Sequence, residues 1–168
     1  MTLDEMPAYF GAIRARAEAA AVPCVDAIAS TYEEHLTGVT LKESGAHPPV
    51  TRTPAPPARP PAFMTGELAA SVTRTPGAGS GGVAEASVAP HTIYAATQEF
   101  GGIHHGKPDM WLWVKYIGAA EVWRRGWVKG TVTIPPRPYM STAVDETIAN
   151  GSLVRSAEDA FMAAVWGE

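Results

Sequence analysis

The amino-acid sequence predicts an α+β protein, with an N-terminal helix, an antiparallel β-sheet that includes a hairpin, and C-terminal helices packed on the sheet. Apolar residues recur at helical spacing in residues 1–38 and again after residue 136. The segment between them combines β-branched residues and tryptophans with glycine-rich turns, which is typical of strands. Nothing resembles the repeated strand–helix–strand units of a parallel sheet, so we expect antiparallel pairing.

Residues 1–38 are predicted to be helical, because their apolar residues lie three and four positions apart. Pro23 falls inside this pattern. It lacks an N–H and clashes with the preceding turn, so we expect it to kink the helix or split it in two. Gly38 is expected to end the helix. The apolar stripe comprises Met6, Tyr9, Phe10, Ile13, Ala17, Ala20, Cys24, Ile28, Tyr32 and Leu36.

Residues 39–62 are predicted to be a linker or arm. Seven prolines lie between Pro48 and Pro61, among residues with little apolar surface to bury. Such a segment favours an extended, polyproline-like conformation over the surface. Binding of this segment in an aromatic groove is the alternative, although no specific docking pattern is present.

Residues 63–168 are expected to form the α+β core of what is a single domain overall. The segment from Thr65 to Ser71 is predicted to be a short capped helix with Leu68 facing inward. Two strands, Val72–Thr75 and Gly82–Ala89, are expected to flank a turn over residues 76–82.

Two further stretches, Met110–Tyr116 and Val122–Ile134, resemble strands, with Gly126 and Gly130 indicating bulges or a long hairpin. The C-terminal pattern is helical from Pro136, with Pro138 in the first turn. Asn150-Gly151 is expected to end this helix, and Ser152 is expected to cap the last one.

Composition excludes several classes of protein. The 168 residues are 46% apolar and 18% charged, which is typical of a folded globular chain. A net charge of −4 without a basic cluster argues against a protein that grips nucleic acid. The N-terminus does not resemble a signal peptide, and no apolar run approaches the roughly 20 residues of a membrane span. The one cysteine, Cys24, cannot form an internal disulfide, which fits synthesis in a reducing cytoplasm.

No set of residues has the pattern of a catalytic or cofactor site. His104, His105 and Asp109, with His91 nearby, are suitable metal ligands by type, but a polar loop between two strands explains them equally well. Cys24 falls on the apolar face of the predicted helix, where an inert thiol is usual. The glycine-rich run over residues 77–82 lacks the lysine of a phosphate-binding loop and is read as a turn.

Glu99 is the one acid beside a dense apolar cluster, between Gln98 and Phe100. General acid catalysis needs a partner carboxylate or histidine, and none can be placed near it. We therefore favour a salt bridge, a cap to a turn, or a pairing between subunits with an arginine. The candidate arginines are Arg124, Arg125 and Arg137.

The tryptophans of the β-rich middle form a candidate contact surface. Trp111 and Trp113 are two positions apart, and Trp123 and Trp127 flank the arginine pair 124–125. Aromatics interleaved with arginine can stack on bases or sugars. They can equally line a half-buried sheet and pack on a partner protein, and the negative net charge favours packing.

Three motifs in a fixed order give the sequence a resemblance to the tail-completion (minor tail, neck) proteins of long-tailed bacteriophages, which join head to tail. They are Thr65-Gly-Glu-Leu-Ala-Ala-Ser71, Tyr94-Ala-Ala-Thr-Gln-Glu-Phe-Gly101 and Arg137-Pro-Tyr-Met140. The resemblance covers about residues 60–150. The sequence departs from it at Gly102, where many relatives have Thr, and in the proline-rich and tryptophan-rich segments.

The resemblance implies a non-enzymatic structural protein of the virion, made in the bacterial host and placed where the tail meets the capsid connector. It implies a homo-oligomeric ring, expected to be a hexamer, through which genome DNA passes without specific binding. The partners of this ring are expected to be tail terminator, tail tube and head-closure proteins. No cofactor or metal is expected. Tyr94, Glu99, Phe100 and the turn Arg137-Pro138-Tyr139 are expected to order the junction between sheet and helix, and the tryptophan-rich hairpin and proline-rich arm to make contacts.

Three alternatives remain. Within the same class, the chain fits a tail terminator or a head-closure protein. From other classes, a small metal-dependent hydrolase would use His104, His105 and Asp109, and a sugar- or nucleic-acid-binding module would use the tryptophans and arginines of the hairpin.

Overall fold

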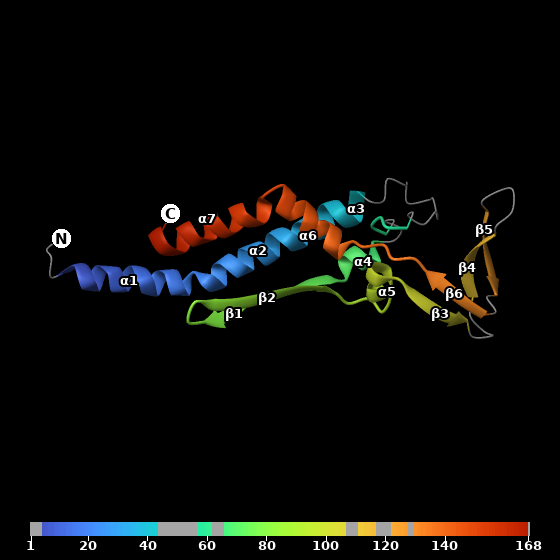
Figure 1. The fold of residues 1–168 in the computed structure, drawn as a ribbon, viewed down its shortest axis with the longest axis horizontal. Helices are drawn as coiled ribbons and strands as arrows, with labels where there is room; N and C mark the ends of the chain where they lie inside the picture. The colour runs from blue at the N-terminus through green and yellow to red at the C-terminus, as the bar shows by residue number, and fades with distance from the viewer. Residues whose placement is uncertain are drawn as a thin grey trace.

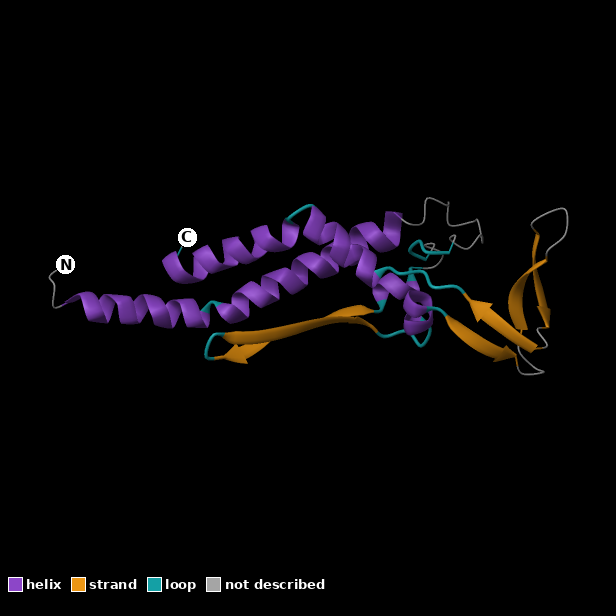
Figure 2. Ribbon diagram, in the orientation of Figure 1, coloured by secondary structure: helices purple, strands orange, loops and turns teal. Residues whose placement is uncertain are grey.

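The computed structural model describes residues 5–43, 57–61, 66–106, 111–116, 122–127 and 130–167. For residue 43, and for those of these residues that lie between 104 and 132, it describes the backbone alone. The molecule is elongated, with the helices and a long hairpin toward one end and the remaining strands toward the other (Figure 1). The long helices lie toward the two ends of the chain and the antiparallel strands lie between them, interrupted by a short helix (Figure 2), which confirms the predicted α+β class.

The N-terminal helical segment comprises α1 (Met6–Ala19), α2 (Ala21–His35), a π-helical turn (Leu36–Thr40) and α3 (Leu41–Glu43). The predicted split is confirmed: the α-helix is interrupted at Ala20, and Pro23 lies in the first turn of α2, where its missing N–H has no helical partner to lose. The predicted end at Gly38 is wrong, because helical structure continues to Glu43. Burial of Leu36 and Leu41, on either side of Gly38, stabilises the continuation.

The long hairpin consists of β1 (Val72–Ser80) and β2 (Val83–Pro90), preceded by the short helix α4 (Glu67–Ala70). The predicted turn over residues 76–82 is too wide: strand pairing continues to Ser80, and the turn itself is Gly81-Gly82, both with positive φ. Two consecutive residues with positive φ match the tight turn that antiparallel hairpins favour. A bulge between Thr75 and Ala78 absorbs the irregular stretch.

The other strands form two antiparallel pairs. The segment around His104 and His105, predicted to be a loop, is strand β3 (Gly102–Gly106), which pairs with β6 (Gly130–Ile134). Strand β4 (Trp111–Tyr116) pairs with β5 (Val122–Trp127), as the two β-like stretches predicted. A pairing partner about 30 residues away stabilises β3, and such a partner gives no local signal in the sequence.

The C-terminal helices are α6 (Met140–Ala149) and α7 (Ser152–Trp166). The corner at Asn150-Gly151 is confirmed, but Pro138 precedes the helix instead of occupying its first turn. Ser152 is the first residue of α7 and Gly151 is its N-cap residue, so the predicted cap at Ser152 is wrong. The N–H of Ser152 donates to the Asn150 side chain at 2.8 Å.

Helix α2 is the central element of the helical part. It packs along α7 and also along both strands of the hairpin, so the N-terminal helix, and not α7, covers the β1–β2 hairpin (Figure 1). The C-terminal helices reach the sheet through the start of α6, where Tyr139 and Ala143 join Val72 of β1 in the core. Helix α1 buries none of its residues.

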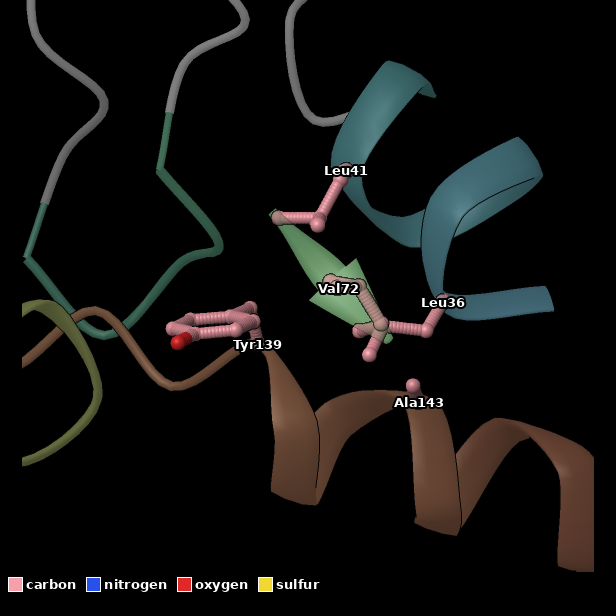
Figure 3. Close-up of a cluster of buried hydrophobic side chains, with 5 residues drawn as sticks. All are labelled: Leu36, Leu41, Val72, Tyr139 and Ala143. Carbon is pink, nitrogen blue, oxygen red and sulfur yellow. The ribbon is translucent and has the colours of Figure 1, made fainter. Parts of the chain in front are cut away.

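The core is a small cluster at the point where α2, the π-helical turn, β1 and α6 meet (Figure 3). Its buried members are Leu36, Leu41, Val72, Tyr139 and Ala143. Leu68 of α4 packs against it, as its predicted inward position requires. In the part of the chain that the structure describes, no helix is both long and apolar enough to cross a membrane.

Candidate functional site

The junction at the start of α6 is built around the carboxylate of Glu99. A helix begins with backbone N–H groups that have no partner within the helix. Glu99, on the short helix α5 (Ala95–Phe100), satisfies three of them: its Oε2 accepts from the N–H of Tyr139 at 2.7 Å and of Met140 at 2.9 Å, and its Oε1 accepts from the N–H of Ser141 at 3.1 Å. The Ser141 hydroxyl donates to the same Oε1 at 2.9 Å.

These contacts fix the charge state of Glu99, which is only 8% exposed. Burial by itself raises the pKa of this carboxyl, but the three backbone donors and the Ser141 hydroxyl together bring the pKa below its ordinary value. The side chain is therefore ionised at neutral pH. Its four donors occupy about all the lone-pair sites that a carboxylate offers. Glu99 therefore holds the start of α6 in place, and we refer to it as a clamp; it has no free lone pair with which to act as a general acid or base.

Two tyrosines pack at the junction and form hydrogen bonds there. The ring of Tyr139 is fully buried in the core (Figure 3), and its hydroxyl donates to the Ala95 carbonyl at 3.4 Å. The hydroxyl of Tyr32, on α2, donates to the Met140 carbonyl at 3.0 Å. Burial, together with the nearby Glu99 charge, raises the pKa of both phenols to about 12. Both side chains thus stay neutral hydrogen-bond donors across the physiological range.

Backbone hydrogen bonds hold α5 to the chain that enters α6. The N–H of Arg137 donates to the Gln98 carbonyl at 2.7 Å. Gly101 ends α5 with φ 71°, and a Cβ there would lie 2.8 Å from the Ile134 carbonyl oxygen and 2.9 Å from the Pro136 nitrogen. The same entry to α6 is also held from residues 57–61, where the N–H of Ala58 donates to the Pro136 carbonyl at 3.0 Å. Only glycine fits at residue 101, because both the φ angle and the space exclude a side chain.

The structure selects among the roles proposed for the junction residues. Glu99 caps the start of helix α6, in agreement with the capping role that was among its expected roles. It caps a helix instead of a turn, and the segment around it that was predicted to be a turn is itself helix α5. Phe100, predicted to order the junction, is 79% exposed and does not pack there. The reason is geometric: Ala95 and Glu99, one turn apart, face the junction, and Phe100 is on another side of the helix.

The remaining junction residues surround this clamp. Tyr94 precedes α5 and is half-buried, and burial followed by the Glu67 charge raises the pKa of its phenol. Arg137 is half-buried, and burial lowers the pKa of its guanidinium. Pro138 accepts a hydrogen bond at its carbonyl from the Thr142 hydroxyl at 3.0 Å, within the first turn of α6.

The tryptophan and arginine candidates lie on the β4–β5 hairpin. In the backbone register, Trp111 lies opposite Trp127, Trp113 opposite Arg125, and Arg124 opposite Val114. Lys115 lies opposite Trp123. Their side chains fall outside the described part of the structure, so the predicted contacts of this hairpin stay predictions.

One important cluster has no counterpart in the sequence predictions. Arg74, on β1, forms ion pairs with Asp26 and Glu33 of α2, and its Nε lies 3.3 Å from the Glu33 carboxylate. Asp26 also accepts a hydrogen bond at 3.1 Å from the N–H of Gly77, at the β-bulge. Asp26 and Glu33 are seven residues apart and so lie on one helix face, and this spacing was the sequence signal from which the cluster could have been predicted. The cluster attaches the hairpin to α2.

The alternative metal site is not tested by these contacts. His104 and His105 occupy adjacent positions of β3, and Asp109 lies outside the described residues. His91 Nε2 is 2.6 Å from the Thr73 hydroxyl. Among the residues that the structure describes, no three His, Cys, Asp or Glu side chains gather as metal ligands. Cys24 is half-buried with its Sγ 3.5 Å from the Ala157 carbonyl, against α7.

Comparison of this chain with protein-family models, with curated proteins and with solved structures finds no match.

Proposed function

We propose that this protein is a structural component of the neck of a long-tailed bacteriophage, where it completes the tail and joins it to the capsid connector. In this proposal several copies, expected to be six, form a ring around the channel through which the genome passes. The protein would act by holding surfaces in place, without catalysis and without a cofactor.

The observation that carries the proposal is the convergence of the three motifs behind the resemblance on one junction. The first motif supplies Leu68, which packs on the core, and the second supplies Glu99. The third supplies Tyr139 and Met140, whose N–H groups Glu99 accepts. Segments about 30 and 40 residues apart thus form one unit. Motifs that matched by chance would have no reason to meet, so this convergence supports the resemblance.

The chemistry of the junction also favours a structural role. Glu99 is saturated with donors and ionised, and the buried Tyr139 and the partly buried Tyr32 are neutral, so these groups fix the geometry of α6 relative to α5 and α2. A net charge of −4 supports the proposed position beside a DNA channel, because weak repulsion lets a polyanion pass without being trapped.

The test is electron microscopy of particles made by a phage that lacks the gene for this chain. Filled heads beside separate tails of normal length are the expected result. Tails of uncontrolled length would instead assign the role of tail terminator, and emptied heads that of head closure. Normal, infectious virions would contradict the proposal as a whole.

A further inference from the structure

The tryptophans of the β4–β5 hairpin all fall on one of its two faces. Successive residues of a strand alternate between the faces, and residues directly opposite each other on antiparallel strands share a face. The register places six residues on one face in three opposite pairs: Trp111 and Trp127, Trp113 and Arg125, and Lys115 and Trp123. We call these six residues the tryptophan face.

The other face of the hairpin has a different composition. Its pairs are Leu112 and Gly126, Val114 and Arg124, and Tyr116 and Val122. It has one cation and no tryptophan, whereas the tryptophan face has two cations among four tryptophans. Tryptophans opposite each other stabilise a hairpin by themselves, so the cations of this face are not needed for strand pairing. The two consecutive arginines, 124 and 125, lie on different faces.

The charge of the chain is distributed unevenly, and the strands β3 to β6 carry its positive part. Residues 102–134 contain five Lys and Arg and two Asp and Glu, a net charge of +3. Since the whole chain has −4, the remaining residues carry −7. Neither β4 nor β5 contains an acid, and both lie at the end of the molecule away from α1 and α7 (Figure 1). The whole-chain charge, which argues against binding of nucleic acid, therefore does not describe this end.

Aromatic residues alternating with cations suit a ligand that combines flat rings with negative charge. Single-stranded nucleic acid has both: its bases stack on aromatic side chains for about 1–3 kcal/mol each, and its phosphates attract Lys and Arg. A neutral glycan has no charge to attract Lys115 and Arg125. A duplex has the phosphates, but its bases are already stacked inside it.

We infer that the tryptophan face binds single-stranded nucleic acid, without preference for its base sequence. In this inference the tryptophans stack on bases, and Lys115 and Arg125 neutralise phosphates. Residues two positions apart on a strand are separated by about 6.8 Å, so the three pairs extend over about 14 Å, the length of a few nucleotides. The inference goes beyond the neck role and does not rest on it. Because it requires unpaired bases, it leaves the passage of a duplex genome unaffected.

The experiment measures binding of the full chain to a labelled oligothymidylate of about 12 nucleotides by fluorescence anisotropy, over a series of salt concentrations. Two comparison ligands have the same length: a strand of abasic sites, which keeps the phosphates without bases, and a DNA duplex. We expect the oligothymidylate to bind at least about tenfold more tightly than either. In a Trp166→Phe background, where the hairpin holds all the remaining tryptophans, it should also quench their fluorescence.

The neighbouring arginines provide a matched pair of variants. Arg125→Gln, on the tryptophan face, should weaken binding about tenfold and reduce the slope of log affinity against log salt by about 0.7. Arg124→Gln, on the other face, should weaken binding less than about twofold. Trp113→Ala should weaken it about tenfold, and Trp113→Phe, which keeps an aromatic ring, should recover part of the loss. Circular dichroism checks that each variant is folded.

Three results would overturn the inference. An abasic strand that binds as tightly as the oligothymidylate would show a site for polyanions in general, without base stacking. Equal losses from the two arginine variants would show that the binding does not belong to one face. No binding of oligothymidylate at about 20 mM salt would remove the site altogether. Each of these results leaves the neck role standing, because deletion of the gene tests that role separately.

Discussion

Replacing Glu99 tests whether its carboxylate holds the junction together. Glu99→Ala removes the acceptor of four hydrogen bonds and leaves the N–H groups of Tyr139 and Met140 without a partner, in a region where water has little access. Ser141 is exposed, so water can replace what it loses. Glu99→Gln keeps one acceptor oxygen, but it replaces the other with an NH₂ group, a donor that would face the backbone N–H donors.

The size of the effect follows from two donors, the buried N–H of Tyr139 and the partly buried N–H of Met140. A buried donor left unsatisfied costs about 1–3 kcal/mol, so two of them give a loss of about 3 kcal/mol in the free energy of unfolding for Glu99→Ala. This is above the roughly 0.5–2 kcal/mol of an ordinary exposed cap. Glu99→Gln should lose about half as much.

The effect depends on pH in a defined direction. Because the pKa of Glu99 in the folded protein lies below its ordinary value of 4.5, the carboxylate contributes stability fully above pH 4.5 and loses that contribution as the pH falls through the folded-state pKa. The stability difference between the wild type and Glu99→Gln should therefore be largest at pH 7 and shrink in acid.

Urea unfolding followed by circular dichroism at pH 7 and at pH 3 measures both effects. Glu85→Gln, at an exposed position of β2, is the matched control and should change stability by less than about 0.5 kcal/mol. The reasoning is refuted if Glu99→Ala behaves like this control, or if the gap between wild type and Glu99→Gln is as large at pH 3 as at pH 7.

Three further substitutions or titrations test other parts of the fold. Gly101→Ala should cost about 3 kcal/mol and Gly151→Ala about 1 kcal/mol by urea unfolding, because both have positive φ but only the first Cβ meets backbone atoms; equal costs would contradict this. Arg74→Met should cost about 2 kcal/mol by leaving two α2 carboxylates without their guanidinium, and Arg74→Lys should recover part of it; a neutral Arg74→Met would show that apolar packing holds the hairpin. Ultraviolet absorbance titration should show Tyr32 and Tyr139 ionising near pH 12 and not at pH 10, with stability lost from pH 10 upward; normal titration of all tyrosines in folded protein would contradict their burial.

The order of elements could be predicted from the sequence because it depends on local patterns. Helical periodicity, the Asn150-Gly151 corner and the glycine-rich hairpin turn are each encoded within a few residues. What failed depends on distant partners. Gly38 does not end its helix because Leu36 and Leu41 are both buried in a core that β1 and α6 complete. Strand β3 forms because β6 pairs with it.

The candidate site was predicted in part. An acid beside apolar residues pointed to Glu99, and capping was among its expected roles, but its partners lie about 40 residues further along the chain and could not be identified. The exposure of Phe100 follows from α5 being helical, and six residues are too few for a helical period to be recognised. The exposure of Tyr9 and Phe10 could not be predicted for another reason, because an apolar stripe does not reveal what covers it.

Adding the purified protein to a lysate of phage that lacks the gene tests the central claim most directly. The account predicts that filled heads and finished tails join and that the titre of infectious particles rises by orders of magnitude, with Glu99→Ala protein rescuing less than Glu85→Gln protein. If the titre stays at the level of the untreated lysate while both proteins are folded, the chain does not join heads to tails.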